Sequence, residues 1–383
     1  MRICIISPYF TSFVKGSEHG LAQAFTELGQ DVTIVTTRSK APREKMVADE
    51  QHGEQEEYNY KVRYLKSVDF DENPIAPSVF FSVLREKYDV VMLREDYPIM
   101  CHLAYLAAKM KRTPLTLSTD RTYSLSILSF KGFFLGFLDL TINKLVRASV
   151  DAYVAHCTAA KDFVLRALNT HRDVKVIPIG VDTNFFKPVH SYGTYLQEGD
   201  FKILTIARLH PYKGLEYLIK AMDKVVKEKL NVKLYIKGKG EDRKKLEKLV
   251  KDLSLDKHVS FVEKAIPSDE MPELYAECDL YVQPSIIEPF GIAVLEAMTC
   301  GKPVIGTKTG GMLDTIVDGK TGFLIPPADE KALNEAILKL IKDDDLRETM
   351  GRNARAQALK YDWNIIAKRY LDVINEISNQ TKR

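Results

Sequence analysis

Short apolar runs alternate with longer amphipathic segments along the first half of the chain. The segments between the runs, such as residues 19–28 and 100–110, space their apolar residues as a helix does. Strands that alternate with helices of this length indicate a parallel sheet covered on both faces. The strands predicted in this half lie at residues 3–6, 32–35, 62–64, 90–93, 115–117, 153–154 and 174–177.

The alternation stops at residues 182–200 and then begins again. This stretch carries Pro188, Gly193 and Gly199 and has no sustained period, so residues 184–200 are predicted to form a linker. Six more strands are predicted at residues 202–206, 233–236, 259–262, 280–283, 303–305 and 322–325. Helices are predicted between and after them at residues 215–226, 243–253, 271–276, 293–298, 331–342, 346–360 and 363–377.

The repeated alternation predicts an α/β protein with two Rossmann-like, doubly wound parallel-sheet domains. A chain of 383 residues suits two domains better than one core. We expect an N-terminal domain at residues 1–183 and a C-terminal domain at residues 201–361. Ligands of open parallel sheets bind beyond the carboxyl ends of the strands. Two such domains facing each other would therefore place the site in a cleft between them.

The composition narrows the class of protein. Apolar residues make up 45% and charged residues 28%, which is ordinary for a globular protein. The net charge is only +3 and no Lys/Arg stripe carries interleaved aromatic residues, so we expect no nucleic-acid partner. The five cysteines lack zinc-ligand or redox spacing and suit a reducing compartment. The N-terminal sequence MRICIISPYF lacks the longer apolar run of a signal peptide, so we expect a cytoplasmic protein.

The most apolar long stretch, residues 124–148, is broken by charged and polar residues. It therefore lacks the uninterrupted run of about 18 to 20 apolar residues that crosses a membrane. A helix packed over the sheet of the first domain is one interpretation. The other is an amphipathic element that lies on the inner face of a membrane, which would favour a lipid-linked acceptor. Its apolar and basic residues would be Phe130, Lys131, Phe133, Phe134, Phe137, Leu138, Lys144 and Arg147.

The densest group of candidate residues lies at 283–311. Phe290 and Gly291 come just before a predicted helix, with Glu288 ahead of it and Glu296 inside it. Amide groups at such a turn have no partner within the helix and would point at an anionic or hydroxyl-rich ligand. Glu288 could accept hydrogen bonds from sugar hydroxyls, and Glu296 could hold both hydroxyls of a ribose. Since two glutamates at this spacing are common, ordinary loop and exposed helix positions are the alternative.

A pair of cations, Arg208 and Lys213, follows the first predicted strand of the second domain. Arginine offers a planar fork for phosphate oxygens, and lysine offers a mobile point charge. Two cations in this loop could stabilise a departing nucleoside diphosphate without a metal. The alternative is that both are solvated loop charges.

Glu288-Pro-Phe-Gly together with Glu296 resembles the E-x7-E motif of the family-four retaining glycosyltransferases, which have the two-domain GT-B fold. The similarity continues through ARLHPYKG (207–214), IKGKGEDRKKLE (236–247), VIPIGVDTNFFKP (176–188) and GKPVIGTKTGGMLDTIVDGKTGFLIPP (301–327). In VIPIGVD, Ile179 replaces the usual asparagine. Each motif is weak alone, but their shared order and spacing are specific.

The resemblance implies retaining transfer of a hexose from a nucleoside diphosphate sugar, such as UDP-glucose or GDP-mannose, to a hydroxyl group. The acceptor would be lipid-linked, a saccharide or a small molecule, in polysaccharide or glycolipid biosynthesis. The donor sugar would be a substrate, with no further cofactor and no metal. The implied donor contacts are Arg208 and Lys213 to the diphosphate, Glu288 to the sugar, Glu296 to the ribose, and the amides of Phe290, Gly291 and Ile292. A C-terminal helix within residues 362–383 would cross back to the first domain.

The first domain departs from the family pattern in two places. Gly16 and Ser17 stand where the family has two glycines near the donor, so the backbone has less freedom there. Asp120 stands where many members have a histidine that touches the transferred sugar. It could still accept a sugar hydroxyl, and Arg121 could be its partner. His156 is better interpreted as a residue packed at the end of a strand than as a ligand.

Four other interpretations remain open. The run Asp343-Asp344-Asp345 fits a D-x-D metal motif, but its place between two helices favours a helix cap. A sugar phosphorylase or a sucrose- or trehalose-forming synthase of the same fold shares these motifs. A Rossmann oxidoreductase would need a G-x-G-x-x-G sequence after the first strand, which is not there. A non-enzymatic sugar-nucleotide sensor conflicts with the retained Arg208, Lys213, Glu288 and Glu296. The sequence indicates no oligomeric state.

Overall fold

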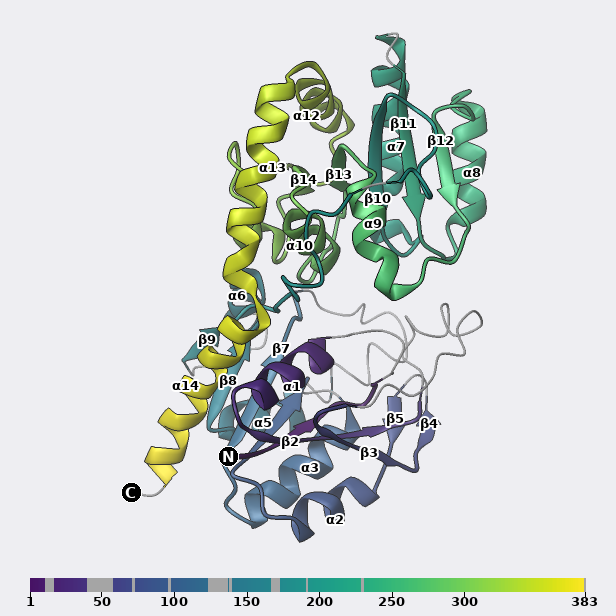
Figure 1. Cartoon of the computed structure of the whole chain (residues 1–383). Helices are drawn as coiled ribbons and strands as arrows, with labels where there is room; N and C mark the ends of the chain where they lie inside the picture. The colour runs from purple at the N-terminus through teal and green to yellow at the C-terminus, as the bar shows by residue number, and fades with distance from the viewer. Residues whose placement is uncertain are drawn as a thin grey trace. The chain divides into compact units, whose positions relative to one another are not determined.

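The chain folds into two compact units, shown in a computed structural model (Figure 1). The structure describes residues 1–10, 17–39, 58–70, 73–95, 98–122, 137, 140–166, 173–190, 192–228 and 231–381. Unit 1 consists of Met1–Gly180 and Trp363–Arg383, and unit 2 consists of Val181–Asp362. The C-terminal segment therefore belongs with the N-terminal half of the chain.

Unit 1 contains a parallel sheet with the strand order β3-β2-β1-β6-β7-β8-β9. Its strands are β1 (Arg2–Ile6), β2 (Asp31–Thr37), β3 (Lys61–Leu65), β6 (Val90–Arg94), β7 (Leu115–Thr119), β8 (Ala152–Ala155) and β9 (Val174–Val176). Every strand predicted in this half is present. The helices are α1 (Ser17–Glu27), α2 (Ser78–Arg85), α3 (Ile99–Met110), α5 (Ile142–Ser149), α6 (Thr158–Arg166) and α14 (Trp363–Thr381).

Some elements of unit 1 were not predicted. They are the helices α2 and α6, and the antiparallel hairpin of β4 (Val68–Phe70) and β5 (Asn73–Ile75). These helices have 8 and 9 residues and the strands have 3 each. Segments this short complete too few turns or alternations to show a period in the sequence.

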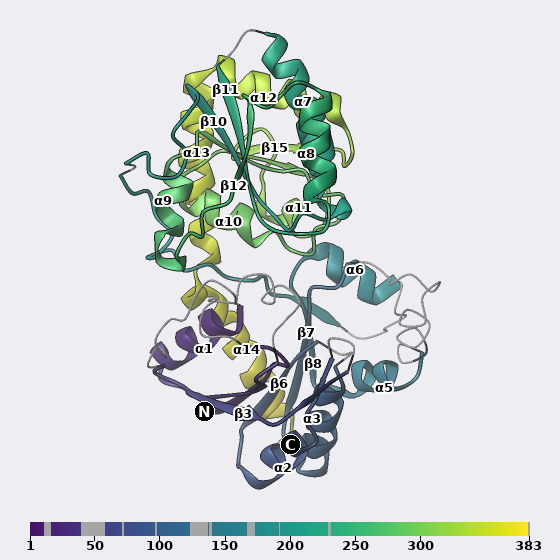
Figure 2. The same ribbon diagram turned by 90° about the vertical axis from the view of Figure 1, so that its right-hand side faces the viewer.

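Unit 2 contains a second parallel sheet with the strand order β12-β11-β10-β13-β14-β15. Its strands are β10 (Phe201–Ile206), β11 (Val232–Lys237), β12 (Val259–Val262), β13 (Leu280–Gln283), β14 (Val304–Thr307) and β15 (Gly322–Ile325). Its helices are α7 (Leu215–Lys227), α8 (Arg243–Asp252), α9 (Met271–Ala276), α10 (Ile292–Thr299), α11 (Met312–Thr315), α12 (Glu330–Lys342) and α13 (Asp344–Ala358), with 3-10 turns at Pro211–Lys213, Ser268–Glu270 and Leu359–Tyr361. All six predicted strands are present. Figure 2 shows β10, β11, β12 and β15 among them.

The central strands of both sheets are buried on both faces. Every residue of β6, β7 and β13 is buried, because helices cover the two sides of each sheet. Parallel strands in this position appear as continuous apolar runs in the sequence. This burial explains why the strands could be located from the sequence.

The segment predicted as a linker, residues 184–200, is instead folded onto unit 2. The buried carboxylate of Glu277 accepts hydrogen bonds from the amides of Thr194, Tyr195 and Leu196, at 2.7, 2.9 and 2.5 Å. These bonds anchor an irregular segment whose partner lies some 80 residues further along the chain. The chain passes between the units at 180–181 and 362–363, where the Val181 amide donates to the Tyr361 carbonyl at 2.9 Å.

Helix α14 packs along α1 within unit 1 (Figures 1 and 2). Ile366, Tyr370 and Ile374 are buried on its inner face, and Tyr370 meets Phe25 of α1 at a ring-centroid distance of 6.3 Å. Ile365 is 45% exposed. The helix therefore completes the core of unit 1.

The only tryptophan of the chain, Trp363, lies in a slot that two glycines leave open. A Cβ added to Gly20 would lie 2.1 Å from the indole Nε1, and one added to Gly180 would lie 2.5 Å from the ring carbons. Side chains at either position would therefore displace the ring.

Gly20→Ala tests this slot, because helix propensity and packing predict opposite signs. Alanine in a helix interior is favoured by roughly 1 kcal/mol over glycine. Overpacking against Trp363 costs about 1–3 kcal/mol. We expect a net loss of stability of unit 1, measured by urea unfolding with circular dichroism. In a Trp363→Ala background, Gly20→Ala should no longer destabilise. A Gly20→Ala protein as stable as the wild type would contradict the packing.

Candidate active site

The loop after β10 carries Arg208 and Lys213 against the loop after β13. The His210 side chain accepts a hydrogen bond from the Tyr212 amide at 3.4 Å, at the start of the 3-10 turn Pro211–Lys213. Gly214 follows with a left-handed φ of 64°, and a Cβ there would lie 2.1 Å from the carbonyl oxygen of Pro284. Glycine thus permits the two loops to touch, and it orients Lys213 toward the second loop.

Lys213 and Glu288 form an ion pair at the contact between these loops. The lysine Nζ lies 2.7 Å from Glu288 Oε2, and the two side chains are only 12% and 10% exposed. The hydroxyl of Ser285 donates to the same oxygen at 2.8 Å. Lys213 and Glu288 lie 75 positions apart in the sequence, and the structure brings these two predicted site residues together.

Arg208 is exposed beside this pair. Its guanidinium carbon lies 5.5 Å from the ring centre of Tyr212, and Lys213 Nζ lies 5.3 Å from the same ring. A cation near an aromatic face is attracted by the ring quadrupole. Tyr212 thus holds two positive charges close to each other while one of them stays open to solvent.

The turn before α10 depends on a pair of glycines from another loop. Gly291 has φ 92° and precedes the first helical residue, Ile292, while the ring of Phe290 is buried. A Cβ on Gly310 would lie 1.5 Å from the Glu288 carbonyl oxygen, and one on Gly311 would lie 2.6 Å from that of Phe290. The glycines let the backbone of this turn pack closely. The first amides of a helix lack partners within it, so the turn suits an anionic ligand.

Glu296 lies just over one turn into α10, where it accepts a hydrogen bond from the hydroxyl of Tyr275 at 2.6 Å. Burial, and then the charge of Glu296, raises the pKa of Tyr275 well above its usual value, so the phenol stays protonated and donates. Tyr275 was not identified from the sequence. Its place at the end of a short amphipathic helix gave no signal of this role.

The two glycines of the IKGKG motif pack against the backbone of the loop that carries Arg208. Cβ atoms on Gly238 and Gly240 would lie 1.8 and 2.2 Å from the carbonyl oxygens of Ala207 and Leu209. Only a chain without side chains at these points can approach the loop so closely. The motif therefore shapes the loop that carries Arg208.

In unit 1, the buried Arg94 at the end of β6 gathers residues from two neighbouring elements. Its guanidinium donates to the hydroxyls of Ser17 and Ser118, both at 3.0 Å, and pairs with Glu18 at 3.2 Å. Ser17, predicted near the donor, is thus held by Arg94, which the sequence did not single out. Gly16 lies outside the described residues.

Asp120 directly follows β7, and its neighbours are acidic. Its amide donates to Glu95 Oε1 at 3.3 Å, and the Thr119 hydroxyl donates to Glu95 Oε2 at 2.9 Å. Glu95 has a left-handed φ of 88°, a costly conformation for a residue with a side chain. Burial raises the pKa of Asp120, against the opposing effects of a hydrogen bond from Glu95 and the charge of Arg94. Arg121, suggested as the partner of Asp120, has its guanidinium 5.6 Å from the ring centre of Phe163.

His156 is packed at the end of a strand, as predicted. Its Nδ1 lies 3.0 Å from the Ile177 carbonyl oxygen, and the side chain is buried. Burial, followed by the charge of Arg94, lowers the pKa of His156 to about 3. A neutral ring with its Nδ1 proton on the carbonyl fits these contacts.

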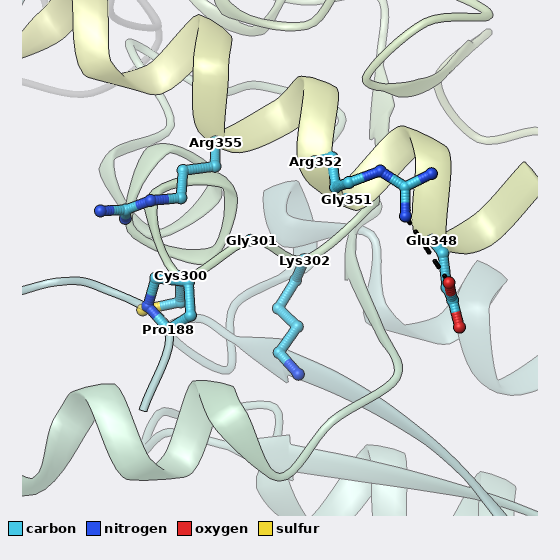
Figure 3. A pocket seen from close by; sticks show the side chains of 8 residues that line it. All are labelled: Pro188, Cys300, Gly301, Lys302, Glu348, Gly351, Arg352 and Arg355. Atoms are coloured by element: carbon cyan, nitrogen blue, oxygen red, sulfur yellow. Dashed lines mark ion pairs between the residues drawn. The ribbon is translucent and has the colours of Figure 1, made fainter. Parts of the chain in front are cut away.

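A hollow of about 440 Å³ lies at the other end of α10, around its C-cap residue Cys300 (Figure 3). Lys302 donates to the Ala276 carbonyl at 2.8 Å, Arg355 donates to the Thr299 carbonyl, and Arg352 pairs with Glu348 at 3.6 Å. Two of these three cations thus satisfy carbonyls at or near helix C-termini, which explains them structurally.

Asp343 caps α13, its side chain accepting from the Leu346 amide at 2.9 Å, as predicted for the acidic run. Among the described residues, no group of three or more His, Cys, Asp or Glu side chains could hold a metal ion. No helix in the described part of the chain is long and apolar enough to cross a membrane.

Comparison with known families identifies the class of protein that this fold and loop arrangement define. Residues 193–357 match the sequence model described as glycosyl transferases group 1. Residues 19–185 match the model described as glycosyltransferase family 4. The two matches cover most of both units in order. The chain therefore belongs to the glycosyltransferases of this family.

Individual relatives agree with this assignment. An uncharacterized glycosyltransferase of Methanocaldococcus jannaschii is 34% identical over 56% of this chain and 57% of its own length. The sulfoquinovosyl transferase of Arabidopsis thaliana is 26% identical over 93% of this chain and 69% of its own. A mannosyltransferase of Mycolicibacterium smegmatis, named as GDP-mannose-dependent and as acting on a phosphatidylinositol monomannoside, is 31% identical over 52% of this chain and 55% of its own.

Solved structures confirm the predicted GT-B fold. A sucrose-phosphate synthase from Thermosynechococcus elongatus matches with a TM-score of 0.77 and 20% identity over 99% of both chains. HepE from Anabaena, solved in complex with UDP-glucose, matches with a TM-score of 0.75 and 23% identity over 98% of this chain and 100% of its own.

The buried His156 leads us to expect that the stability of unit 1 depends on pH. The folded pKa of His156, about 3, lies below its usual 6.5, so the folded state favours the neutral ring. The contribution of His156 to the free energy of unfolding is present above pH 6.5. It is lost as the pH falls toward 3, at up to about 1.4 kcal/mol per pH unit. His156→Gln should flatten this part of the unfolding curve, followed through Trp363 fluorescence, which reports on unit 1. His190→Gln, at an exposed histidine of unit 2, is the control. An unchanged slope in His156→Gln would contradict the assignment.

Proposed function

We propose that the protein transfers a hexose from a nucleoside diphosphate sugar to a hydroxyl acceptor with retention of configuration, without a metal. The observation that carries this proposal is the buried Lys213–Glu288 pair beside the α10 turn. The pair places a cation and a carboxylate next to the turn where α10 begins. The first amides of that helix have no partner within it. These are the groups that a phosphate next to a sugar needs.

The donor contacts divide between the two ends of the nucleotide sugar. Arg208 and Lys213 contact the diphosphate, together with the Phe290, Gly291 and Ile292 amides. A lysine ammonium has three donors, so Lys213 can hold Glu288 and still reach a phosphate oxygen. Glu288 accepts from the hexose, and Glu296 accepts from the ribose.

The reaction needs charge stabilisation more than a protein nucleophile. The bond from the anomeric carbon to the diphosphate oxygen breaks, and the acceptor oxygen bonds to that carbon on the same face. The acceptor proton passes to the departing diphosphate, which gains the electron pair of the broken bond. The two cations stabilise its growing negative charge in place of a divalent ion. In unit 1, Asp120, Gly16 and Ser17 contribute to binding the sugar and the acceptor.

Relatives support UDP-glucose or GDP-mannose as the first donors to test. HepE was solved with UDP-glucose, and the mycobacterial relative is named as GDP-mannose-dependent. A panel of nucleoside diphosphates and their sugars, screened by thermal shift, would identify the base. Turnover with free sugar phosphates or inorganic phosphate would instead favour a synthase or a phosphorylase.

We also propose a lipid-linked acceptor and peripheral docking at the inner membrane face in the cytoplasm. Leu140, Ile142 and Leu145 are 77%, 47% and 62% exposed, whereas Val146 and Arg147 on the other side of α5 are buried. Phe137 and Lys144 are exposed on the same stretch. Residues 124–136, 138 and 139, also considered for this contact, lie outside the described part of the chain. One relative has a lipid in its name, the phosphatidylinositol monomannoside mannosyltransferase of Mycolicibacterium smegmatis.

Lys213→Ala tests the catalytic proposal. Removing the cation leaves the departing diphosphate less stabilised, and we expect kcat/KM for the donor to fall by roughly 100-fold or more. Lys220→Ala is a matched control, because its Nζ also lies near a tyrosine ring, that of Tyr217 at 5.4 Å. Thermal unfolding checks the fold of each variant. Near-normal turnover in a stable Lys213→Ala protein would contradict the assignment of Lys213 to the diphosphate.

A double variant, Ile142→Ser with Leu145→Ser, tests docking on vesicles of phosphatidylglycerol and phosphatidylcholine. Losing two apolar side chains from a bilayer contact should weaken sedimentation with vesicles at least about tenfold. Leu313→Ser, at a leucine of unit 2 that is 46% exposed, should change nothing. Equal binding by all three proteins would rule out this surface.

A further inference from the structure

Glu288 is the last member of a buried chain of hydrogen bonds that begins on β13. The Tyr281 hydroxyl donates to Gln283 Oε1 at 2.8 Å, and Gln283 Nε2 donates to the Ser285 hydroxyl at 2.9 Å. Ser285 then donates to Glu288 Oε2 at 2.8 Å. Tyr281, Gln283, Ser285 and Glu288 are 0, 2, 0 and 7% exposed. Burial on this scale requires every donor to find an acceptor.

The direction of the chain is set at its end, because the Glu288 carboxylate paired with Lys213 accepts and Ser285 must donate to it. At the other end, the Tyr281 oxygen accepts from the Ile206 amide at 3.3 Å, and its proton lies closer to Gln283 Oε1, at an oxygen–oxygen distance of 2.8 Å, than to the Ile206 carbonyl, at 3.3 Å. Burial raises the pKa of Tyr281 well above its usual value, so this proton stays in place. The Gln283 amide must then present its oxygen to Tyr281 and its nitrogen to Ser285. Ser285 has one proton, and it is directed at Glu288.

The chain leaves the two oxygens of Glu288 in different states. Oε2 accepts from both Lys213 and Ser285, at 2.7 and 2.8 Å. Oε1 has no hydrogen-bond partner among the described residues. Two donors on one oxygen restrict rotation of the carboxylate and keep the other oxygen available to a ligand.

We infer that Tyr281, Gln283 and Ser285 are positioning residues that fix Glu288 Oε1 for a hexose hydroxyl of the donor, with Gln283 linking Tyr281 to Ser285. The inference rests on the proposed function. It assigns discrimination between a nucleotide sugar and the bare nucleotide to residues that need not touch either one. The ion pair alone would hold the carboxylate at one point and leave it free to turn.

Binding of UDP and UDP-glucose by calorimetry tests the inference, with GDP and GDP-mannose as a second pair. UDP has no hexose, so its affinity reports on the rest of the site. Ser285→Ala removes one of the two donors to Glu288. We expect the preference for UDP-glucose over UDP to fall about tenfold while UDP binds within about twofold of wild type. Tyr281→Phe should act in the same direction but more weakly, because it acts through Gln283.

Gln283→Glu tests the direction of the chain without changing side-chain volume. A glutamate at 283 can accept from Tyr281 but cannot donate to Ser285, so the serine proton turns away from Glu288. The preference for the sugar nucleotide should fall as in Ser285→Ala. Ser285→Ala, which adds no buried charge, decides the question if Gln283→Glu does not fold. Thr299→Val is the matched control, since its buried hydroxyl donates to the Leu295 carbonyl at 2.6 Å, within the same helix.

The outcomes separate the inference from the proposed function. If Ser285→Ala keeps the wild-type preference, or loses UDP and UDP-glucose affinity equally, the positioning role is wrong and the proposed function stands. If the wild type binds none of the four nucleotides, both fail.

Discussion

The contact between the β10 and β13 loops is the constraint on which the rest of the site depends. Gly214 touches the carbonyl of Pro284, and the amides of Ile286 and Ile287 donate to the Tyr212 carbonyl at 2.8 and 3.1 Å. These two hydrogen bonds hold the loops together where Lys213 and Glu288 meet. A buried ion pair costs desolvation energy that only good geometry and further hydrogen bonds offset. Ser285 supplies such a bond, so the pair is both neutral overall and fixed in direction.

The same logic of close backbone approach extends along the site. Gly310 and Gly311 press against the turn before α10, and Gly238 and Gly240 press against the Arg208 loop. Side chains at these points would push the loops apart and separate the cations from the helix amides. The glycines of the family motifs are thus explained by packing between loops, and the charged residues are placed by that packing. A ligand that fits here meets preformed groups, which lowers the cost of binding.

Much of this arrangement could be predicted, and the exceptions have physical causes. The central strands, buried on both faces, gave continuous apolar runs, and the partly exposed edge strands were located as well. The linker at 184–200 was wrong, because its anchor Glu277 lies far along the chain and no local pattern reveals it. Tyr281 and Gln283 did leave a signal. They are polar residues two positions apart in a fully buried strand, and such residues need partners.

The departure at Asp120 changes the charge of this part of unit 1. A carboxyl group in place of a histidine stands beside Glu95, in a part of the unit that already holds Glu18. Burial raises the pKa of Asp120, while a hydrogen bond with Glu95 and the charge of Arg94 oppose that shift. Arg94 is itself paired with Glu18 at 3.2 Å. A carboxyl group can accept a hydrogen bond in either protonation state. On the proposed role, Asp120 therefore binds a sugar hydroxyl as an acceptor, and the change from histidine alters the charge of the site without removing that capacity.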